Sequence, residues 1–262
     1  MCFVLIASGQ SETWPIVLAA NRDEFHARPT READFWPDQP EILAGRDLQA
    51  GGTWLGVHRN GRFAALTNFR GPDGNPIKGR SRGLLVLDYL HYETDLESFN
   101  RQLVSSANDY EGFNLLYGTL PKLNHFSNRG NQAGELRSGV HGLSNHLLDT
   151  PWPKVVRGKN AIRSILQASE NKEVDKLQEN LLKLLMNKTL ADDQDLPNTG
   201  IDRVLERRLS AIFIQGENYG TRCSTLVLQH HSGDIHFFEQ NYSPSGRMTS
   251  RKTCVLPVNG RS

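Results

Sequence analysis

The second residue of the chain, Cys2, carries two groups that can do nucleophilic chemistry if it becomes the N-terminus. Cells remove an initiator methionine when the next side chain is small, and cysteine is small enough. Loss of Met1 leaves a free α-amine, with a reference pKa of about 7.7–8.0, beside a thiol with a reference pKa of about 8.5. The amine can then serve as the base that activates its own side chain. The alternative is an ordinary buried cysteine that opens a strand.

A strand-sized apolar run is followed directly by four polar residues, Asn21, Arg22, Asp23 and Glu24. If that run pairs with the first strand, these side chains lie near one end of the first strand. Asp23 can then hold an α-ammonium by a charge-assisted hydrogen bond, and Arg22 can bind a carboxylate or stabilise developing negative charge. The alternative is a transition from strand to loop with solvated charges.

Two asparagines and one arginine are further candidates. Asn68 ends an apolar strand and Asn145 follows Gly142-Leu143-Ser144, and an amide NH₂ is a suitable oxyanion donor. Arg222, near the start of a late strand, can bind an anion. The alternatives are turn-forming or capping asparagines and a surface arginine.

Short apolar runs separated by turn residues predict strands that pair as hairpins. Asn60-Gly61 between two such runs is a strong hairpin signal. The predicted strands are residues 2–8, 14–20, 53–58, 63–69, 113–119, 123–127, 140–144, 221–229, 234–240 and 253–258.

Helical periodicity marks the segments between these groups of strands. The predicted helices are residues 82–92, 95–108, 153–166, 171–187 and 202–210, and the predicted loops are residues 71–76, 132–137 and 191–199. The dominance of hairpins favours antiparallel sheets layered with helices, an α+β class, over an alternating parallel sheet.

Composition limits the class of protein. Lys plus Arg number 30 and Asp plus Glu 29 in 262 residues, so the formal charge is +1. That balance argues against a nucleic-acid partner and against a polybasic membrane anchor, although a local basic pocket remains possible. A single domain over residues 1–262 is expected, because large mixed folds often stay single at this length.

The chain shows no targeting or membrane segment that we can identify. No apolar run reaches the roughly 18 residues of a membrane span, and the start lacks the basic region of a signal peptide. Three cysteines, Cys2, Cys223 and Cys254, are an odd number without metal-ligand spacing. A cytoplasmic protein without a disulfide framework or a metal site is expected, and its oligomeric state cannot be read.

Taken together, the motifs resemble the transport-and-Golgi-organisation protein 2 family, also called the NRDE family after Asn21, Arg22, Asp23 and Glu24. The resemblance covers nearly the whole chain. It rests on Met1-Cys2, residues 18–25, Arg28-Pro29, Gly51-Gly52-Thr53-Trp54-Leu55-Gly56, Ala65-Leu66-Thr67-Asn68, Gly112-Phe113-Asn114-Leu115, Gly142-Leu143-Ser144-Asn145, Thr150-Pro151-Trp152 and Tyr219-Gly220-Thr221-Arg222.

This family resembles N-terminal-nucleophile hydrolases of the penicillin V acylase and bile salt hydrolase type. The resemblance implies a four-layer αββα sandwich in which Cys2 attacks an amide or thioester carbonyl. Asp23 would orient the α-amine, and Asn68 and Asn145 would be oxyanion or amine partners.

The resemblance also implies a looser role for Arg222 and one departure from the acylases. Those enzymes carry an arginine one or two residues before the Asn-x-Asp element, where this chain has Ala19 and Ala20. Arg22 would supply the charge from a different backbone position. Asn21, Glu24 and Trp54 are the expected ligand-binding residues.

The resemblance further implies cytosolic haem trafficking, with haem as cargo, or binding of acyl-CoA and lipids. Haem carriage needs an apolar slot, an arginine for the propionates and an axial ligand, and none of the nine histidines shows ligand spacing. Trp54 could line such a slot or pack in the core. We therefore carry three hypotheses: a haem-binding chaperone, a Cys2-dependent amidohydrolase or thioesterase without a catalytic cofactor, and an acyl-CoA binder.

Overall fold

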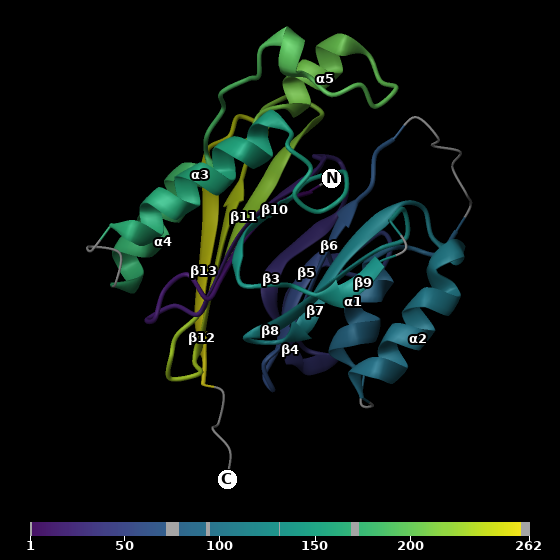
Figure 1. The fold of residues 1–262 in the computed structure, drawn as a ribbon, viewed down its shortest axis with the longest axis vertical. Coiled ribbons are helices and arrows are strands. Elements are labelled where there is room, and N and C mark those ends of the chain that lie inside the picture. Colours follow the sequence, from purple (N-terminus) through teal and green to yellow (C-terminus); the bar gives the residue numbers. More distant parts are fainter. Residues whose placement is uncertain (1, 72–78, 93–94, 131, 169–172, 258–262) are drawn as a thin grey trace.

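Two antiparallel sheets packed face to face form the centre of the computed structural model, and helices cover the outer face of each sheet (Figure 1). The structure describes residues 2–71, 79–92, 95–130, 132–168 and 173–257. The layer order is helix, sheet, sheet, helix. The α+β class and the four-layer αββα sandwich predicted above are confirmed.

The six-stranded sheet has the order β10-β1-β2-β11-β12-β13, and each neighbouring pair is antiparallel. Its strands are β1 (Cys2–Ser8), β2 (Ile16–Phe25), β10 (Gly139–Leu143), β11 (Tyr219–Gln229), β12 (Ile235–Tyr242) and β13 (Met248–Leu256). β1 lies between β10 and β2 and pairs with both from Val4 to Ser8, whereas its first residue, Cys2, pairs with β2 alone, opposite Arg22.

The seven-stranded sheet has the order β3-β4-β5-β6-β7-β8-β9, again antiparallel throughout. Its strands are β3 (Thr30–Trp36), β4 (Gln39–Asp47), β5 (Leu55–His58), β6 (Arg62–Asn68), β7 (Phe113–Thr119), β8 (Lys122–Ser127) and β9 (Gln132–Glu135). Neighbouring strands follow one another along the chain, so the whole sheet is a meander of hairpins.

Amphipathic helices complete the outer layers. They are α1 (Gly83–Leu90), α2 (Leu96–Ser106), α3 (Pro153–Gln167), α4 (Val174–Leu185) and α5 (Arg203–Leu209), with short 3₁₀ turns at Ala107–Asp109 and Asp193–Asp195. α3 packs on β1 and β10, and α4 on β2 and β11, whereas α1 packs on β5, β6 and β7. A Cβ at Gly158 would lie 2.8 Å from the ring carbon Cζ of Phe3, so glycine lets α3 approach β1 closely.

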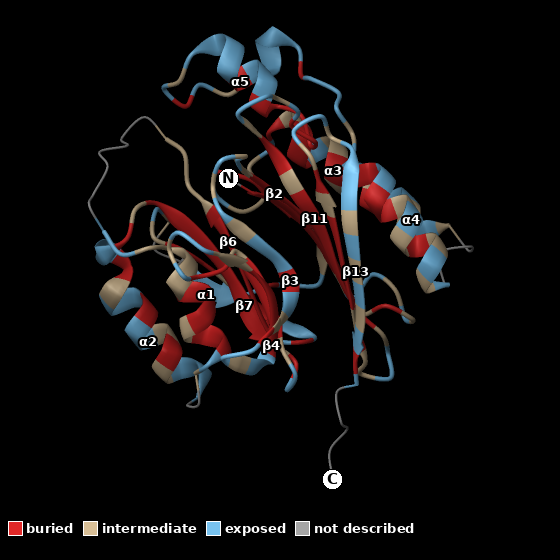
Figure 2. Ribbon diagram, turned by 180° about the vertical axis from the view of Figure 1, so that it is seen from behind, coloured by how far each residue is buried: buried red, intermediate tan, exposed pale blue. Residues whose placement is uncertain are grey.

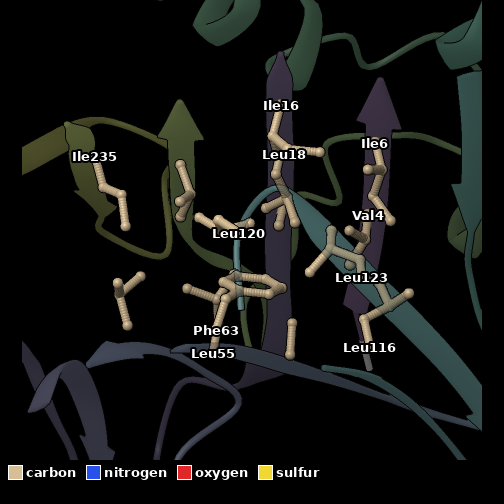
Figure 3. Packing of buried hydrophobic residues seen from close by; sticks show 14 of the residues in the cluster. Val4, Ile6, Ile16, Leu18, Leu55, Phe63, Leu116, Leu120, Leu123 and Ile235 are labelled. Atoms are coloured by element: carbon tan, nitrogen blue, oxygen red, sulfur yellow. The ribbon is translucent and has the colours of Figure 1, made fainter. Parts of the chain in front are cut away.

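Burial on both faces explains why β1 reads as a continuous apolar run. Val4 and Ile6 point into the core between the sheets (Figure 3), while Phe3 and Leu5 belong to the core under α3 and α4. Figure 2 shows the same pattern in the inner strands, which are buried along most of their length. Since side chains alternate along a strand, Cys2 lies on the face between the sheets, together with Val4 and Ile6.

The structure corrects part of the predicted element pattern. Residues 132–137 were expected to form a polar loop, but residues 132–135 form the edge strand β9, which pairs with β8. An edge strand is held by main-chain hydrogen bonds on one side, so it needs no apolar alternation. The hairpin of β3 and β4 was missed because β3 carries exposed charged residues such as Arg31 and Glu32. Of the loop predicted at residues 71–76, residues 72–76 lie outside the described part of the chain.

None of the helices in the described part of the chain is both long and apolar enough to cross a membrane.

Candidate functional site

A cavity of about 350 Å³ lies at the end of the molecule where β1 begins, β2 ends and β6 ends. Its lining comes from both sheets and from the residues that precede α1. The lining residues are Cys2, Arg22, Asp23, Glu24, Arg28, Asp47, Ala50, Thr53, Trp54, Leu66, Asn68, Gly79, Arg80, Ser81, Arg82, Gly83 and Glu111. Six of the nine candidate residues named from the sequence therefore line the cavity, namely Cys2, Arg22, Asp23, Glu24, Trp54 and Asn68.

Register places Cys2 beside Arg22. The two residues are direct partners in the antiparallel pair of β1 and β2, so their side chains share one face of the sheet. The Arg22 guanidinium lies 4.1 Å from the centroid of the Trp54 ring, and its Nη1 donates a hydrogen bond to Thr30 Oγ1 at 3.0 Å. These contacts hold the cationic group in the cavity wall. Burial raises the pKa of the Cys2 thiol, and the charge of Arg22 acts in the opposite direction.

Asp23 is almost fully buried and is held by contacts from β11. Its Oδ1 accepts a hydrogen bond from Thr221 Oγ1 at 2.7 Å, and its main-chain oxygen accepts one from the Tyr219 hydroxyl at 3.1 Å. Burial raises the pKa of the Asp23 carboxyl, whereas the charge of Lys154 lowers it. The carboxyl is thus fixed next to Cys2 in an environment that penalises its ionised form.

A β-bulge on β11 explains the position of Arg222. The register with β2 shifts between Thr221 and Cys223, so Arg222 is the extra residue on the bulged strand. Its Nη1 donates to the main-chain oxygens of Phe25 and Arg28, at 2.9 and 3.1 Å. Arg222 is not among the residues that line the cavity, and this placement favours a role in holding the turn after β2 over the anion contact expected from the sequence.

The two candidate asparagines are in contact but differ in position. Asn68 lines the cavity, whereas Asn145 lies behind it and donates from Nδ2 to the main-chain oxygen of Asn68 at 3.0 Å. The main-chain oxygen of Asn145 also accepts a hydrogen bond from the Arg70 amide at 2.7 Å. Asn68 is therefore placed to meet a ligand, and Asn145 is placed to position Asn68.

Asn21 points away from the cavity, into the layer between the six-stranded sheet and its helices. Its Nδ2 donates to the main-chain oxygens of Leu185 and Ile212, both at 2.9 Å, and its Oδ1 accepts from Ser224 Oγ at 2.6 Å. This full set of internal partners favours a structural role over the ligand contact expected from the sequence.

Four arginines line the cavity, and two of them are neutralised there. Arg28 pairs with Asp47 at 2.7 Å and Arg82 with Glu111 at 3.2 Å. Within the described residues, neither Arg22 nor Arg80 forms an ion pair with a carboxylate. The cavity thus keeps positive charge available for an anionic group on a ligand. Asp23 and Glu24 are the opposing acidic residues in the lining, and Glu24 Oε1 accepts a hydrogen bond from the Phe25 amide at 2.9 Å.

Close backbone contact shapes the part of the cavity wall at the start of α1. A Cβ at Gly52 would lie 2.5 Å from the carbonyl carbon of Gly83, and the Thr53 amide donates to the Gly83 oxygen at 3.2 Å. Glycine at both positions lets the turn before β5 touch the start of α1. The Gly51-Gly52-Thr53-Trp54 motif thus has a physical reason, which is to bring Thr53 and Trp54 into the lining.

Sequence reasoning missed several residues of the site. Arg28, Asp47, Arg80 and Arg82 line the cavity but were not proposed as site residues. Arg28 lies in a quoted motif, and Arg80-Ser81-Arg82-Gly83 is a local basic cluster that could have drawn attention. Lys154 was also missed.

No group of three or more His, Cys, Asp or Glu side chains suited to a metal ion occurs among the residues that the structure describes.

Comparison with known proteins identifies the family. The family model described as Transport and Golgi organisation 2 matches residues 1–244. This chain belongs to that family. It is 36% identical over 242 residues to the Transport and Golgi organization protein 2 homolog of Bos taurus, an alignment that covers 86% of each chain. It is 30% identical over 275 residues to Transport and Golgi organization protein 2 of Drosophila melanogaster, with 92% of each chain covered.

A solved structure supports the fold assignment. A variant of the conjugated bile acid hydrolase from Clostridium perfringens superposes on this chain with a TM-score of 0.53 at 10% identity. The superposition covers 100% of this chain and 95% of the hydrolase chain. Membership of the family and the likeness in fold to a bile salt hydrolase, both expected from the motifs, are confirmed.

Replacing Asn21 by alanine should destabilise the fold. The change leaves the Leu185 and Ile212 oxygens and the Ser224 hydroxyl without their present partner, and an unsatisfied buried polar group costs about 1–3 kcal/mol. Urea unfolding should show a lower midpoint with an unchanged slope. The exposed residue Asn160 provides the control, because Asn160→Ala should change the unfolding free energy by less than about 1 kcal/mol. Equal effects of the two variants would contradict the structural role of Asn21.

Proposed function

We propose that this chain is an N-terminal-nucleophile hydrolase in which the Cys2 thiol attacks an amide or thioester carbonyl. The observation that carries this proposal is the placement of Cys2 in the cavity wall, opposite Arg22 in the strand register and adjacent to buried Asp23. A strand-opening cysteine without a catalytic role needs no cavity, no cation beside it and no buried carboxyl.

The chemistry follows from Cys2 as the N-terminal residue after removal of Met1. The α-amine takes the thiol proton, and the sulfur attacks the carbonyl carbon to give a tetrahedral oxyanion. When the C–N or C–S bond breaks, the α-ammonium gives its proton to the departing amine or thiol and an acyl-enzyme remains. Water, deprotonated by the same amine, then attacks the acyl carbon, releases a carboxylic acid and restores the thiol.

The surrounding side chains suit the charges that develop in these steps. Arg22 and the side chain of Asn68 lie in the cavity wall as candidate donors to the oxyanion. Asn145 fixes the main chain of Asn68 by its hydrogen bond. Asp23, held by Thr221, is the candidate partner of the α-ammonium. These roles agree with those implied by the resemblance, with Asn145 acting through Asn68.

The charge of the cavity supports an anionic substrate. Arg22 and Arg80 lack carboxylate partners among the described residues, so a carboxylate or phosphate on the substrate could form ion pairs with them. The same feature is the specific support for the second candidate function, carriage of haem or acyl-CoA, because both ligands are anionic.

Haem carriage has less support from the lining. Its apolar residues are Ala50, Trp54 and Leu66, whereas a porphyrin face needs apolar walls. None of the nine histidines, all of which the structure describes, is among the lining residues, so an axial ligand would have to be Cys2. Saturable haem binding with a shift of the Soret band that is lost in Cys2→Ala would favour carriage.

The cytoplasmic location remains a prediction.

Replacing Cys2 by alanine should abolish hydrolysis. A panel of acyl thioesters and amides with and without a carboxylate should yield a substrate whose turnover falls at least roughly 10³-fold in Cys2→Ala, because the nucleophile is removed. Intact mass spectrometry should detect the acyl adduct on the native protein only. Cys254→Ala, which changes a half-buried cysteine on β13, is the matched control and should retain activity. Hydrolysis that survives in Cys2→Ala would overturn the proposal.

Replacing Arg80 by methionine should weaken binding of anionic substrates selectively. Loss of one charge-assisted contact should raise KM about tenfold for a substrate with a carboxylate and leave KM for a neutral analogue unchanged. Added salt should reduce the difference between the native protein and the variant. Arg101→Met, at an exposed ion pair with Glu97 on α2, supplies the control. An equal rise in KM for both substrates would exclude charge recognition by Arg80.

A further inference from the structure

Lys154 is the one buried lysine in the described part of the chain, and its environment is unfavourable for a cation. It lies in the first turn of α3, immediately after Pro153, with 3% of its surface exposed. Burial penalises the charged ammonium, and the positive end of the helix dipole adds to that penalty. A solvent-exposed lysine at this position would avoid the free-energy cost of burying an ammonium group, so the burial of Lys154 needs an explanation.

The charges that face Lys154 come from the elements that surround the Cys2 site. In order of effect on its ammonium they are Asp23 on β2, Arg70 after β6, Cys2 on β1 and Glu206 on α5. The Lys154 Nζ also lies 5.9 Å from the centroid of the Phe3 ring, next to Cys2 in β1. Lys154 is therefore on the helix side of the strands whose ends form the cavity.

Asp23 connects Lys154 to the cavity. Asp23 is among the residues that line the cavity, and Lys154 is the strongest charge that opposes the effect of burial on its carboxyl. The coupling is mutual, because Asp23 is also the largest charge that acts on Lys154. The other buried charges nearby are already engaged with each other. Arg70 Nη2 donates to Glu206 Oε2 at 3.0 Å, and Glu206 Oε1 accepts from the Thr199 amide at 3.0 Å.

We propose that Lys154 is a positioning residue of the Cys2 site, whose ammonium lies behind the strand ends and compensates the negative charges of the Asp23 carboxylate and the Cys2 thiolate. This inference deepens the proposed function and rests on it. An ionised Asp23 is what holds an α-ammonium beside the thiol, and Lys154 supplies the compensating charge that a buried carboxylate requires.

The action of Lys154 is confined to a defined pH range. Burial, its largest cause, lowers the pKa of Lys154 to about 8, while Asp23 raises it. The ammonium is therefore present below about pH 8 and lost above it. Removing the side chain should slow formation of the Cys2 thiolate below this pH and have little effect above it, where the native amine is already neutral.

The first experiment measures Cys2 alkylation against pH. A short iodoacetamide pulse between pH 5 and 10, followed by peptide mass analysis, gives the rate at Cys2 separately from the rate at Cys254. At pH 6–7 the rate at Cys2 should be about three- to tenfold slower in Lys154→Met than in the native protein, and the curves should converge near pH 9. Lys154→Arg should restore the rate at low pH, because it restores the charge.

Matched controls separate charge from folding. Lys159→Met removes one lysine from the same helix, where Lys159 pairs with Asp149, and its curve should follow that of the native protein. The rate at Cys254 should be the same in all variants. A Lys154→Met curve that coincides with the native curve below pH 8, or a slowing of equal size at every pH, would overturn the proposal.

A second measurement needs no substitution of Lys154. With ¹³C-labelled lysine, NMR titration should show that Asp23→Asn lowers the pKa of Lys154, because coupling between two sites is reciprocal. An unchanged titration would also overturn the proposal.

Neither readout uses a substrate. Absence of hydrolysis with the expected titrations would therefore count against the proposed function alone, and hydrolysis with unmoved titrations would count against Lys154 alone.

Discussion

The antiparallel pairing of β1 with β2 is the constraint on which the site depends. It sets Cys2 opposite Arg22 and brings Asp23 to the same end of the sheet. The pairing cannot slip by one residue, because β1 and β2 are buried on both faces and a slip would exchange the side chains of the two cores. The stability of the sandwich and the placement of the nucleophile therefore have one physical origin.

Burial of charge is the second feature of the site. Arg22, Asp23 and Lys154 are all buried, and each is compensated by contacts from a different part of the chain. Arg22 uses Trp54 and Thr30, Asp23 uses Thr221 and the charge of Lys154, and Lys154 uses Asp23. Such an arrangement is unfavourable for stability alone, since buried charges lose their hydration, and it is typical of functional sites.

The sequence predicted the parts of the molecule that local patterns determine. Helical periodicity located α1 to α5, and the Asn60-Gly61 turn located the hairpin of β5 and β6. The motif of residues 21–24 indicated Arg22, Asp23 and Glu24 as cavity residues. Contacts between distant segments could not be read in the same way. Whether Asn21 meets a ligand depends on the face of β2 that carries it, and its partners Leu185 and Ile212 are far away in the sequence.

The same limit explains the other differences. Arg222 does not line the cavity, and the β-bulge that carries it is a property of the pairing between β2 and β11 that no residue type marks. Lys154 sits among residues that predict a helix start, and only the packing of α3 against β1 shows that it is buried. Arg28 and Arg80 are distant in the sequence, and only the folded structure shows that both line the same cavity.

The most direct test of the account is the intact mass of the protein purified from cells that carry methionine aminopeptidase. The account predicts a mass lower by one methionine residue, with Cys2 as the first residue in N-terminal sequencing. A chain that retains Met1 would block the α-amine of Cys2 in a peptide bond, and the proposed self-activation of the thiol would be contradicted.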